Sequence, residues 1–122
     1  MTSEIKKSQN MSLKEVCQGL NDLAARGRNK KLAADEVSGG TFSLTNVGGW
    51  GSLTSNPIIN QPQVAILGIG AIVKRAVVAS DDSIEVKPMM LASLTFDHRV
   101  IDGEGGCKFL IDFKTMLESF EG

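Results

Sequence analysis

The order of elements predicted along the sequence is a helix, a series of strands and a closing helix, which indicates an α+β fold with a mixed sheet backed by helices. Apolar residues recur at helical spacing near both ends of the chain, over residues 12–27 and 103–120. Between these segments, short apolar runs follow one another with no helical pattern between them. Strands that are neighbours in the sequence favour the α+β class over the alternating α/β class.

The first helix has a clear predicted start. Residues 12–15 (Ser-Leu-Lys-Glu) are a capping-box pattern, in which the serine hydroxyl and the glutamate carboxylate satisfy each other's free amides. The apolar stripe that follows consists of Leu13, Val16, Leu20 and Leu23. Gly27 is the predicted end of the helix. The basic run 28–31 is interpreted as a solvated helix end rather than a phosphate site, because cations are favoured there.

The next segments predict a short helical turn over 32–37 and a first strand over 41–47. In that strand Phe42 and Leu44 share one face and Thr45 lies on the other, as expected of a half-buried strand. Its polar face is expected to look into a site or a subunit interface. The glycine-rich residues 48–52 predict a loop, and two prolines keep residues 57–62 extended.

The central part of the chain predicts further strands. Residues 64–73 are almost continuously apolar and predict one buried strand. Gly68 and Gly70 within it indicate a bulge or close packing, because the third glycine of a dinucleotide-binding motif is absent. Two further strands, 75–79 and 84–87, flank the turn 80–83 and predict a hairpin. The last strand is expected at 89–96, and the closing helix carries an apolar face of Leu110, Phe113, Leu117 and Phe120.

The composition excludes several classes of function. A chain of 122 residues can bury a core of ordinary domain size. Its 13 basic and 14 acidic residues give no electrostatic case for nucleic acid or a membrane surface, and no apolar run approaches the ~20 residues that span a bilayer. Cys17 and Cys107 have no metal-like spacing. We therefore expect reduced thiols in a cytoplasmic protein without a metal.

The most informative segment is residues 97–103, Asp-His-Arg-Val-Ile-Asp-Gly, because it holds the one histidine of the chain, His98. Histidine is the side chain whose ordinary pKa lies nearest to neutral pH, so it is the natural candidate for moving a proton. It lies between the predicted last strand and the glycine-rich start of the closing helix. Junctions of this kind are exposed at the edge of a sheet, where sites are usually built.

This segment resembles the signature of the dihydrolipoamide acyltransferases, which form the cores of the 2-oxo acid dehydrogenase complexes. Residues 39–46 (Gly-Gly-Thr-Phe-Ser-Leu-Thr-Asn) resemble the first glycine-led strand of that family, and residues 56–68 resemble its second signature block. The three blocks stand in the family's order. The resemblance implies a two-layer sandwich similar to chloramphenicol acetyltransferase, which assembles as trimers.

The resemblance also implies that residues 1–122 are a single, partial catalytic domain, its C-terminal half. The lipoyl and subunit-binding domains of the family have no counterpart, since the chain contains no Asp-Lys-Ala lipoylation site and no Pro/Ala-rich linker. Absence of the first half is expected to leave an apolar surface or an unpaired strand edge.

In the family, an acyl group passes between a dihydrolipoyl arm, carried on a separate domain, and coenzyme A. By resemblance, His98 is the base that activates the thiol, and Thr45 of a neighbouring subunit donates a hydrogen bond to the oxyanion. Asp102 has two open roles, as the N-cap of the closing helix and as an organiser of the site. The implied partners are a homotrimer or larger core and the other components of the complex. A branched-chain or succinyl group is favoured and acetyl is allowed. The alternative is an inactive module that serves in assembly.

Overall fold

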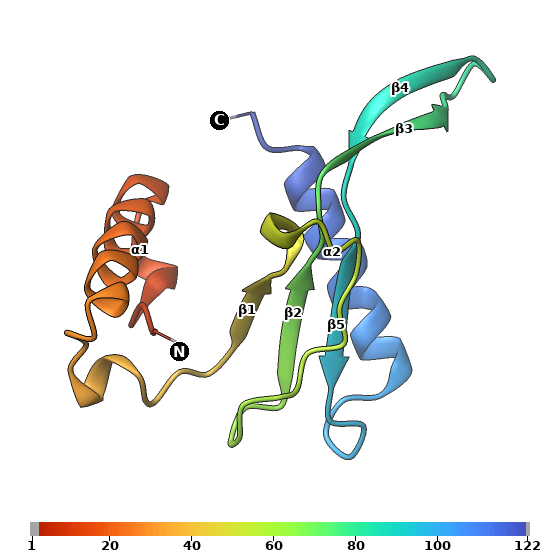
Figure 1. Cartoon of the computed structure of the whole chain (residues 1–122). Helices are drawn as coiled ribbons and strands as arrows, with labels where there is room; N and C mark the ends of the chain where they lie inside the picture. Colours follow the sequence, from red (N-terminus) through yellow and green to blue (C-terminus); the bar gives the residue numbers. More distant parts are fainter. Residues whose placement is uncertain (1–2, 122) are drawn as a thin grey trace. The chain divides into compact units, whose positions relative to one another are not determined.

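The computed structural model describes residues 3–121. They divide into two compact units, residues 1–41 and 42–122, which are considered separately. The first unit contains the helix α1 (Leu13–Arg28) and two short 3-10 turns, η1 (Ser8–Asn10) and η2 (Ala34–Glu36). The second unit contains, in chain order, β1 (Ser43–Asn46), the 3-10 turn η3 (Gly48–Trp50), β2 (Ala65–Ile69), β3 (Val73–Val78), β4 (Ile84–Met89), β5 (Ala92–Phe96) and α2 (Gly103–Glu118) (Figure 1).

The second unit is built on a three-stranded sheet in the order β1-β2-β5. β1 pairs with β2 in parallel and β2 pairs with β5 in antiparallel, so the predicted mixed sheet is confirmed. β3 and β4 form the predicted antiparallel hairpin, which projects beyond the end of the sheet (Figure 1). Helix α2 packs against β5, which confirms the closing helix on the sheet.

The central strand β2 is buried on both faces. Leu67 is 2 % exposed, and Ala65 and Ile66 are also buried. Residues of segment 52–63 lie on one face, because a Cβ atom on Gly68 would come within 2.3 Å of the Ser55 hydroxyl. On the other face of the sheet, α2 packs against β5. A Cβ atom on Gly106 of α2 would come within 2.6 Å of the ring of Phe96 in β5. The close packing predicted for Gly68, in the apolar run 64–73, is therefore confirmed.

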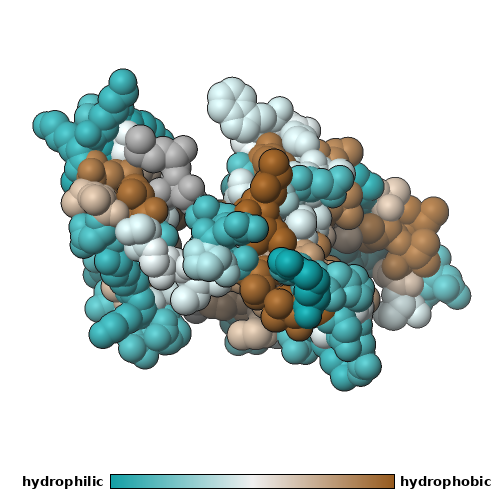
Figure 2. Space-filling model, turned by 90° about the horizontal axis from the view of Figure 1, so that it is seen from below, coloured by the Kyte–Doolittle hydropathy of each residue, from teal (hydrophilic) through white to brown (hydrophobic). Residues whose placement is uncertain are grey.

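Apolar side chains also reach the surface in patches (Figure 2). On the β3–β4 hairpin, directly opposed residues share a face, and the pairs Ala76–Val86 and Val78–Ile84 make one face apolar. Val86, Val78 and Ile84 are each at least 70 % exposed. β1 and β5 are the outer strands of the sheet. The expected apolar surface and open strand edges are thus both present in the part of the chain that the structure describes.

The first unit confirms the capping box. The Ser12 amide donates to Glu15 Oε2 at 2.7 Å, and the Glu15 amide donates to Ser12 Oγ at 3.3 Å. The predicted end at Gly27 is slightly early, because α1 continues to Arg28. The left-handed residue that follows is Lys30, with φ 55°, so the turn expected at the glycine occurs further along.

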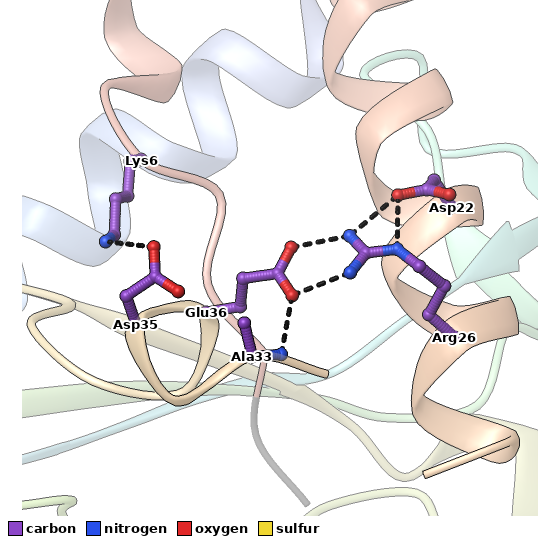
Figure 3. Close-up of polar contacts among 6 residues, drawn as sticks. All are labelled: Lys6, Asp22, Arg26, Ala33, Asp35 and Glu36. Atoms are coloured by element: carbon purple, nitrogen blue, oxygen red, sulfur yellow. Dashed lines mark hydrogen bonds and ion pairs between the residues drawn. The ribbon is translucent and has the colours of Figure 1, made fainter. Parts of the chain in front are cut away.

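An ion-pair cluster holds α1 against the turn η2 (Figure 3). Arg26 donates to both carboxylate oxygens of Glu36, each at 2.6 Å, and its Nε donates to Asp22 Oδ2 at 2.8 Å. The Ala33 amide donates to Glu36 Oε2 at 2.8 Å. These bonds, the guanidinium first, lower the pKa of Glu36 from 4.5 to about 2. This charged contact joins two elements that share little buried apolar surface.

Three sequence predictions need correction. The strand predicted over 64–73 is shorter, since β2 ends at Ile69 and β3 begins at Val73. A Cβ atom on Gly70 would come within 2.0 Å of the Leu53 carbonyl oxygen, so another segment passes directly beside the chain there, although the Gly70 amide still donates to the Leu91 carbonyl at 2.9 Å. The strand predicted over 89–96 is also divided, with its first residue in β4 and the rest of the strand in β5 from Ala92.

The third correction concerns the faces of β1. The alternation is present, but the polar Ser43 is 7 % exposed whereas the apolar Leu44 is 61 % exposed. Ser43 can be buried because its hydroxyl donates to Gln63 Oε1 at 2.6 Å. β1 is an outer strand, so the face predicted to be buried stays largely open.

Candidate active site

His98 lies on a tight turn that directly follows β5. The Asp97 amide donates to the Val64 carbonyl at 2.8 Å, which ties the start of the turn to the segment before β2. The amides of Val100 and Ile101 both donate to the Asp97 carbonyl at 3.0 Å. The backbone on either side of His98 is therefore fixed by hydrogen bonds.

The Asp97 carboxylate closes the same turn from its side chain. It accepts from the Arg99 amide at 3.0 Å, and from Arg99 Nε at 2.9 Å and Nη2 at 2.6 Å. The Arg99 side-chain hydrogen bonds, followed by its amide, lower the pKa of Asp97 to about 2, and the same contact raises the pKa of Arg99. At neutral pH this carboxylate is ionised and clamped, so it braces the turn and is no candidate for proton transfer.

The imidazole of His98 is exposed to solvent on this turn. Its ring centroid lies 5.6 Å from that of Phe96, with the ring planes inclined at 44°. Phe96 in turn lies against Gly106, in the first turns of α2. A reactant can therefore approach the imidazole from outside while its inner side rests on an aromatic ring.

Asp102 is the N-cap of α2, which confirms one of its two predicted roles. Its Oδ1 accepts from the Gly105 amide at 2.7 Å, and its carbonyl accepts from the Gly106 amide at 3.1 Å. The helix start is thereby joined to the turn that carries His98. Its second predicted role, organising the site, stays a prediction.

Thr45 lies elsewhere on the sheet. In the register of the sheet, Thr45 is paired with Gly68 of β2, and Gly68 is paired with Ser93 of β5. Phe96 lies three residues further along β5 than Ser93. Two strand spacings across and three residues along place the Cα atoms of Thr45 and Phe96 roughly 14 Å apart. Thr45 also shares a face with Gly68, opposite to the face of Phe96. One chain therefore does not bring Thr45 and His98 together.

Of the cavities among the described residues, two that lie in the second unit are lined by neither His98 nor Thr45. The larger, about 650 Å³, lies between the base of the hairpin and the second half of α2 and is lined mainly by apolar residues, among them Met89, Leu110 and Phe113. The smaller, about 240 Å³, lies beside Asn46 and Gly70. The predicted apolar face of α2 thus lines a cavity through Leu110, Phe113 and Leu117.

Residues 3–121 contain no group of three or more His, Cys, Asp or Glu side chains that could hold a metal ion. Over the same residues, no helix combines the length and the apolar character needed to cross a membrane. Cys17 and Cys107 are exposed free thiols.

The sequence interpretation missed one contact that supports His98, the packing of the Phe96 ring beside the imidazole. An acid two residues before an arginine is a local signal that Asp97 and Arg99 pair with each other, and this pair serves the local architecture of the turn. The contact of Phe96 depends on the approach of α2 to β5, for which the glycine at position 106 was the sequence signal.

The family profile of the 2-oxoacid dehydrogenases acyltransferase (catalytic domain) matches residues 1–122. The chain belongs to this acyltransferase family. It is 45 % identical over 127 residues to the acetyltransferase component of the pyruvate dehydrogenase complex of Corynebacterium glutamicum, covering 100 % of this chain and 19 % of that protein. It is 46 % identical over 120 residues to the succinyltransferase component of the 2-oxoglutarate dehydrogenase complex of Buchnera aphidicola, covering 98 % of this chain and 29 % of the relative.

Solved structures of the acyltransferase family share the fold. A probable dihydrolipoamide acetyltransferase from Listeria monocytogenes matches with a TM-score of 0.93 at 40 % identity, covering 97 % of this chain and 50 % of the other. The dihydrolipoamide acetyltransferase of Azotobacter vinelandii matches with a TM-score of 0.91 at 32 % identity, covering 96 % and 48 %. The predicted chloramphenicol acetyltransferase-like α+β fold is therefore confirmed. The chain spans about half the length of these solved acyltransferase chains and less than a third of the two curated relatives.

Proposed function

We propose that this chain supplies the histidine-bearing part of a site that transfers an acyl group between dihydrolipoamide and coenzyme A. The observation that carries the proposal is the exposed imidazole of His98, held on a turn fixed from both sides by Asp97, in a chain that matches the acyltransferase family throughout. The open side of the imidazole leaves room for a thiol.

The proposed reaction needs a base that works near neutral pH. A thiol with an ordinary pKa of about 8.5 is mostly protonated at pH 7, so its attack is slow without proton removal. His98 takes the proton of the attacking thiol while the sulfur of that thiol forms a bond to the carbonyl carbon of the thioester. The π electrons of the carbonyl bond move to the oxygen. The oxyanion then collapses, the original C–S bond breaks, and the leaving thiolate receives the proton from the imidazolium. No oxidant or reductant is needed.

Thr45 is the proposed donor to the oxyanion, in a site that His98 of a neighbouring subunit completes in a homotrimer. The separation of the two residues within one chain supports a site shared between chains. A crystallographic and enzymatic study of the Azotobacter vinelandii enzyme concerns the roles of a serine, a histidine and an asparagine in its catalytic mechanism. That histidine and asparagine have the same separation as His98 and Asp102, and the serine precedes the histidine by almost as many residues as Thr45 precedes His98.

Coenzyme A and a lipoyl group on a separate domain are the proposed substrates. The named relatives are an acetyltransferase and a succinyltransferase, so acetyl and succinyl groups are the first to test, with a branched-chain group beside them. A larger core with other components of a dehydrogenase complex is the proposed assembly. One solved relative is the cubic core of the pyruvate dehydrogenase multienzyme complex, which supports this assembly. The free thiols of Cys17 and Cys107 suit the cytoplasm, which we propose as the compartment.

A second candidate function is an inactive module that serves only in assembly. It is favoured by the separation of Thr45 and His98, because one chain alone does not bring the two proposed catalytic groups together. The intact turn that carries His98 argues for catalysis instead.

The deciding experiment measures acyl transfer from acetyl-, succinyl- and isobutyryl-coenzyme A to dihydrolipoamide. Replacing His98 with alanine is expected to lower kcat/KM by about 10²–10⁴-fold, since a positioned base contributes about that much. Asp112→Asn, which changes an exposed charge on α2, is the matched control and should retain activity. A folded wild-type chain without activity towards any of the three donors would contradict the proposal and favour the assembly module.

The shared site has a sharper test. Thr45→Ala is expected to cost about 10²–10³-fold, the usual loss for one oxyanion donor. Mixing and reassembling the inactive His98→Ala and Thr45→Ala chains should restore activity, because some interfaces then combine an intact imidazole with an intact hydroxyl. Persistent inactivity of reassembled mixed trimers would contradict a site formed between subunits.

A further inference from the structure

We propose that Phe96 is a positioning residue for His98, its ring acting as a platform that sets the orientation of the imidazole. This inference rests on the proposed function of His98 as the base. The platform is a three-part contact in which the Phe96 ring lies between the imidazole and the backbone of α2 at Gly106.

The first step is the contact between the two rings. Their centroids are 5.6 Å apart and their planes are inclined at 44°, within the range in which aromatic pairs attract. Among the hydrogen bonds of residues 3–121, none involves the imidazole, although the backbone on both sides of His98 is fixed. The ring contact with Phe96 therefore restrains the side chain itself.

The second step is what holds the platform. A Cβ atom on Gly106 would come within 2.6 Å of one Phe96 ring carbon and 3.0 Å of a second, and real Cβ atoms avoid such approaches. The glycine lets the ring lie directly on the helix backbone, and Gly106 is buried beneath it. Phe96 is also paired with Ala65 of the buried strand β2, so its backbone cannot shift easily.

The third step is the connection to catalysis. A base must meet the thiol proton within hydrogen-bond reach, and a misplacement of about 1 Å can cost about 10²-fold in rate. An exposed imidazole with two free torsions would sample many orientations. The platform limits these orientations while leaving the outer side of the ring open to a reactant.

The test uses the fact that the chain contains a single histidine, so the imidazole protons give isolated NMR signals. Phe96→Leu should shift these signals by removing the ring current, and should lower kcat about 10- to 100-fold with little change in KM. Gly106→Ala keeps both rings but displaces the platform, so it should also shift the imidazole signals.

The matched control is Phe109→Leu. Phe109 lies on α2, as Gly106 does, and its ring pairs with that of Phe42 at 5.6 Å and 43°, almost the same geometry as the Phe96–His98 pair. It should leave both the imidazole signals and kcat unchanged. Folded Phe96→Leu and Gly106→Ala chains with unshifted imidazole signals would overturn the platform. Inactivity of the wild-type chain would contradict the proposed function alone, because the NMR shift does not depend on catalysis.

Discussion

The two units of the chain are stabilised by different interactions. In residues 42–121 the strand β2 is buried between two layers, with Leu67 only 2 % exposed. Of the apolar side chains described in the first unit, Leu23 alone is buried, and its helix is joined to η2 by the pair Arg26–Glu36.

The comparison separates two kinds of sensitivity. Apolar burial does not depend on pH but is sensitive to volume, since interiors are close-packed. An ion pair at a partly exposed position is screened by water and depends on the charge of both partners. We therefore expect the sheet unit to be sensitive to changes in side-chain size, and the first unit to respond to acid.

The largest expected effect comes from Leu67→Ala. Removing this side chain from the middle strand should lower the free energy of unfolding by about 2–5 kcal/mol, the range for leucine-to-alanine changes in cores. Denaturant unfolding followed by circular dichroism measures the change. Hydrogen exchange would show whether the amides of α1 keep their protection, and equal loss in both units would mean that they unfold as one.

A smaller effect is expected from Gly70→Ala. The added methyl would lie within 2.0 Å of the Leu53 carbonyl oxygen, so the backbone must move, and overpacking of this kind costs about 1–3 kcal/mol. Gly49→Ala is the matched control, because nothing lies within 4 Å of its added Cβ. Equal stability of the two variants would show that the segment at Leu53 yields freely and that the sheet unit is less tightly packed than the structure indicates.

Local patterns were sufficient to predict the elements that depend on their own residues. The capping box at Ser12, the hairpin turn at 80–83 and the N-cap at Asp102 each rest on short-range hydrogen bonding, and each is present. The continuous apolar run 64–73 was harder, because a strand buried on both faces has no alternation to mark its end. Just beyond its true end at Ile69, the chain passes closely by Leu53, a contact that no local pattern reports.

The site was also predictable only in part, because some of its contacts join segments that are distant in the sequence. His98 could be found because it is the one histidine in a distinctive segment. The faces of β1 were inverted, because hydropathy cannot show that Gln63 satisfies a buried Ser43. The support of His98 by Phe96 depends on how closely α2 approaches β5, and no local pattern reports the distance between a helix and a strand.

The smallest expected effect is the acid response of the first unit. The pKa of Glu36 is lowered from 4.5 to about 2, chiefly by the Arg26 guanidinium. Because the folded value lies below the unfolded one, the stabilisation is complete above about pH 4.5 and is lost as the pH falls towards 2. Protection of the Ala33 amide against hydrogen exchange, taken relative to the intrinsic rate at each pH, should fall over this range, because this amide donates to Glu36.

Glu36→Gln should remove this acid step and leave the Ala33 amide weakly protected at every pH. Asp35→Asn is the control, since its carboxylate lies beside Glu36 but pairs only with the exposed Lys6, at 3.6 Å. Over the same pH range Asp97, whose pKa is also lowered to about 2, should loosen its turn while the amides of β2 stay protected. Loss of β2 protection in step with Glu36 would show that the sheet unit also depends on charge, and the contrast between the units would fail.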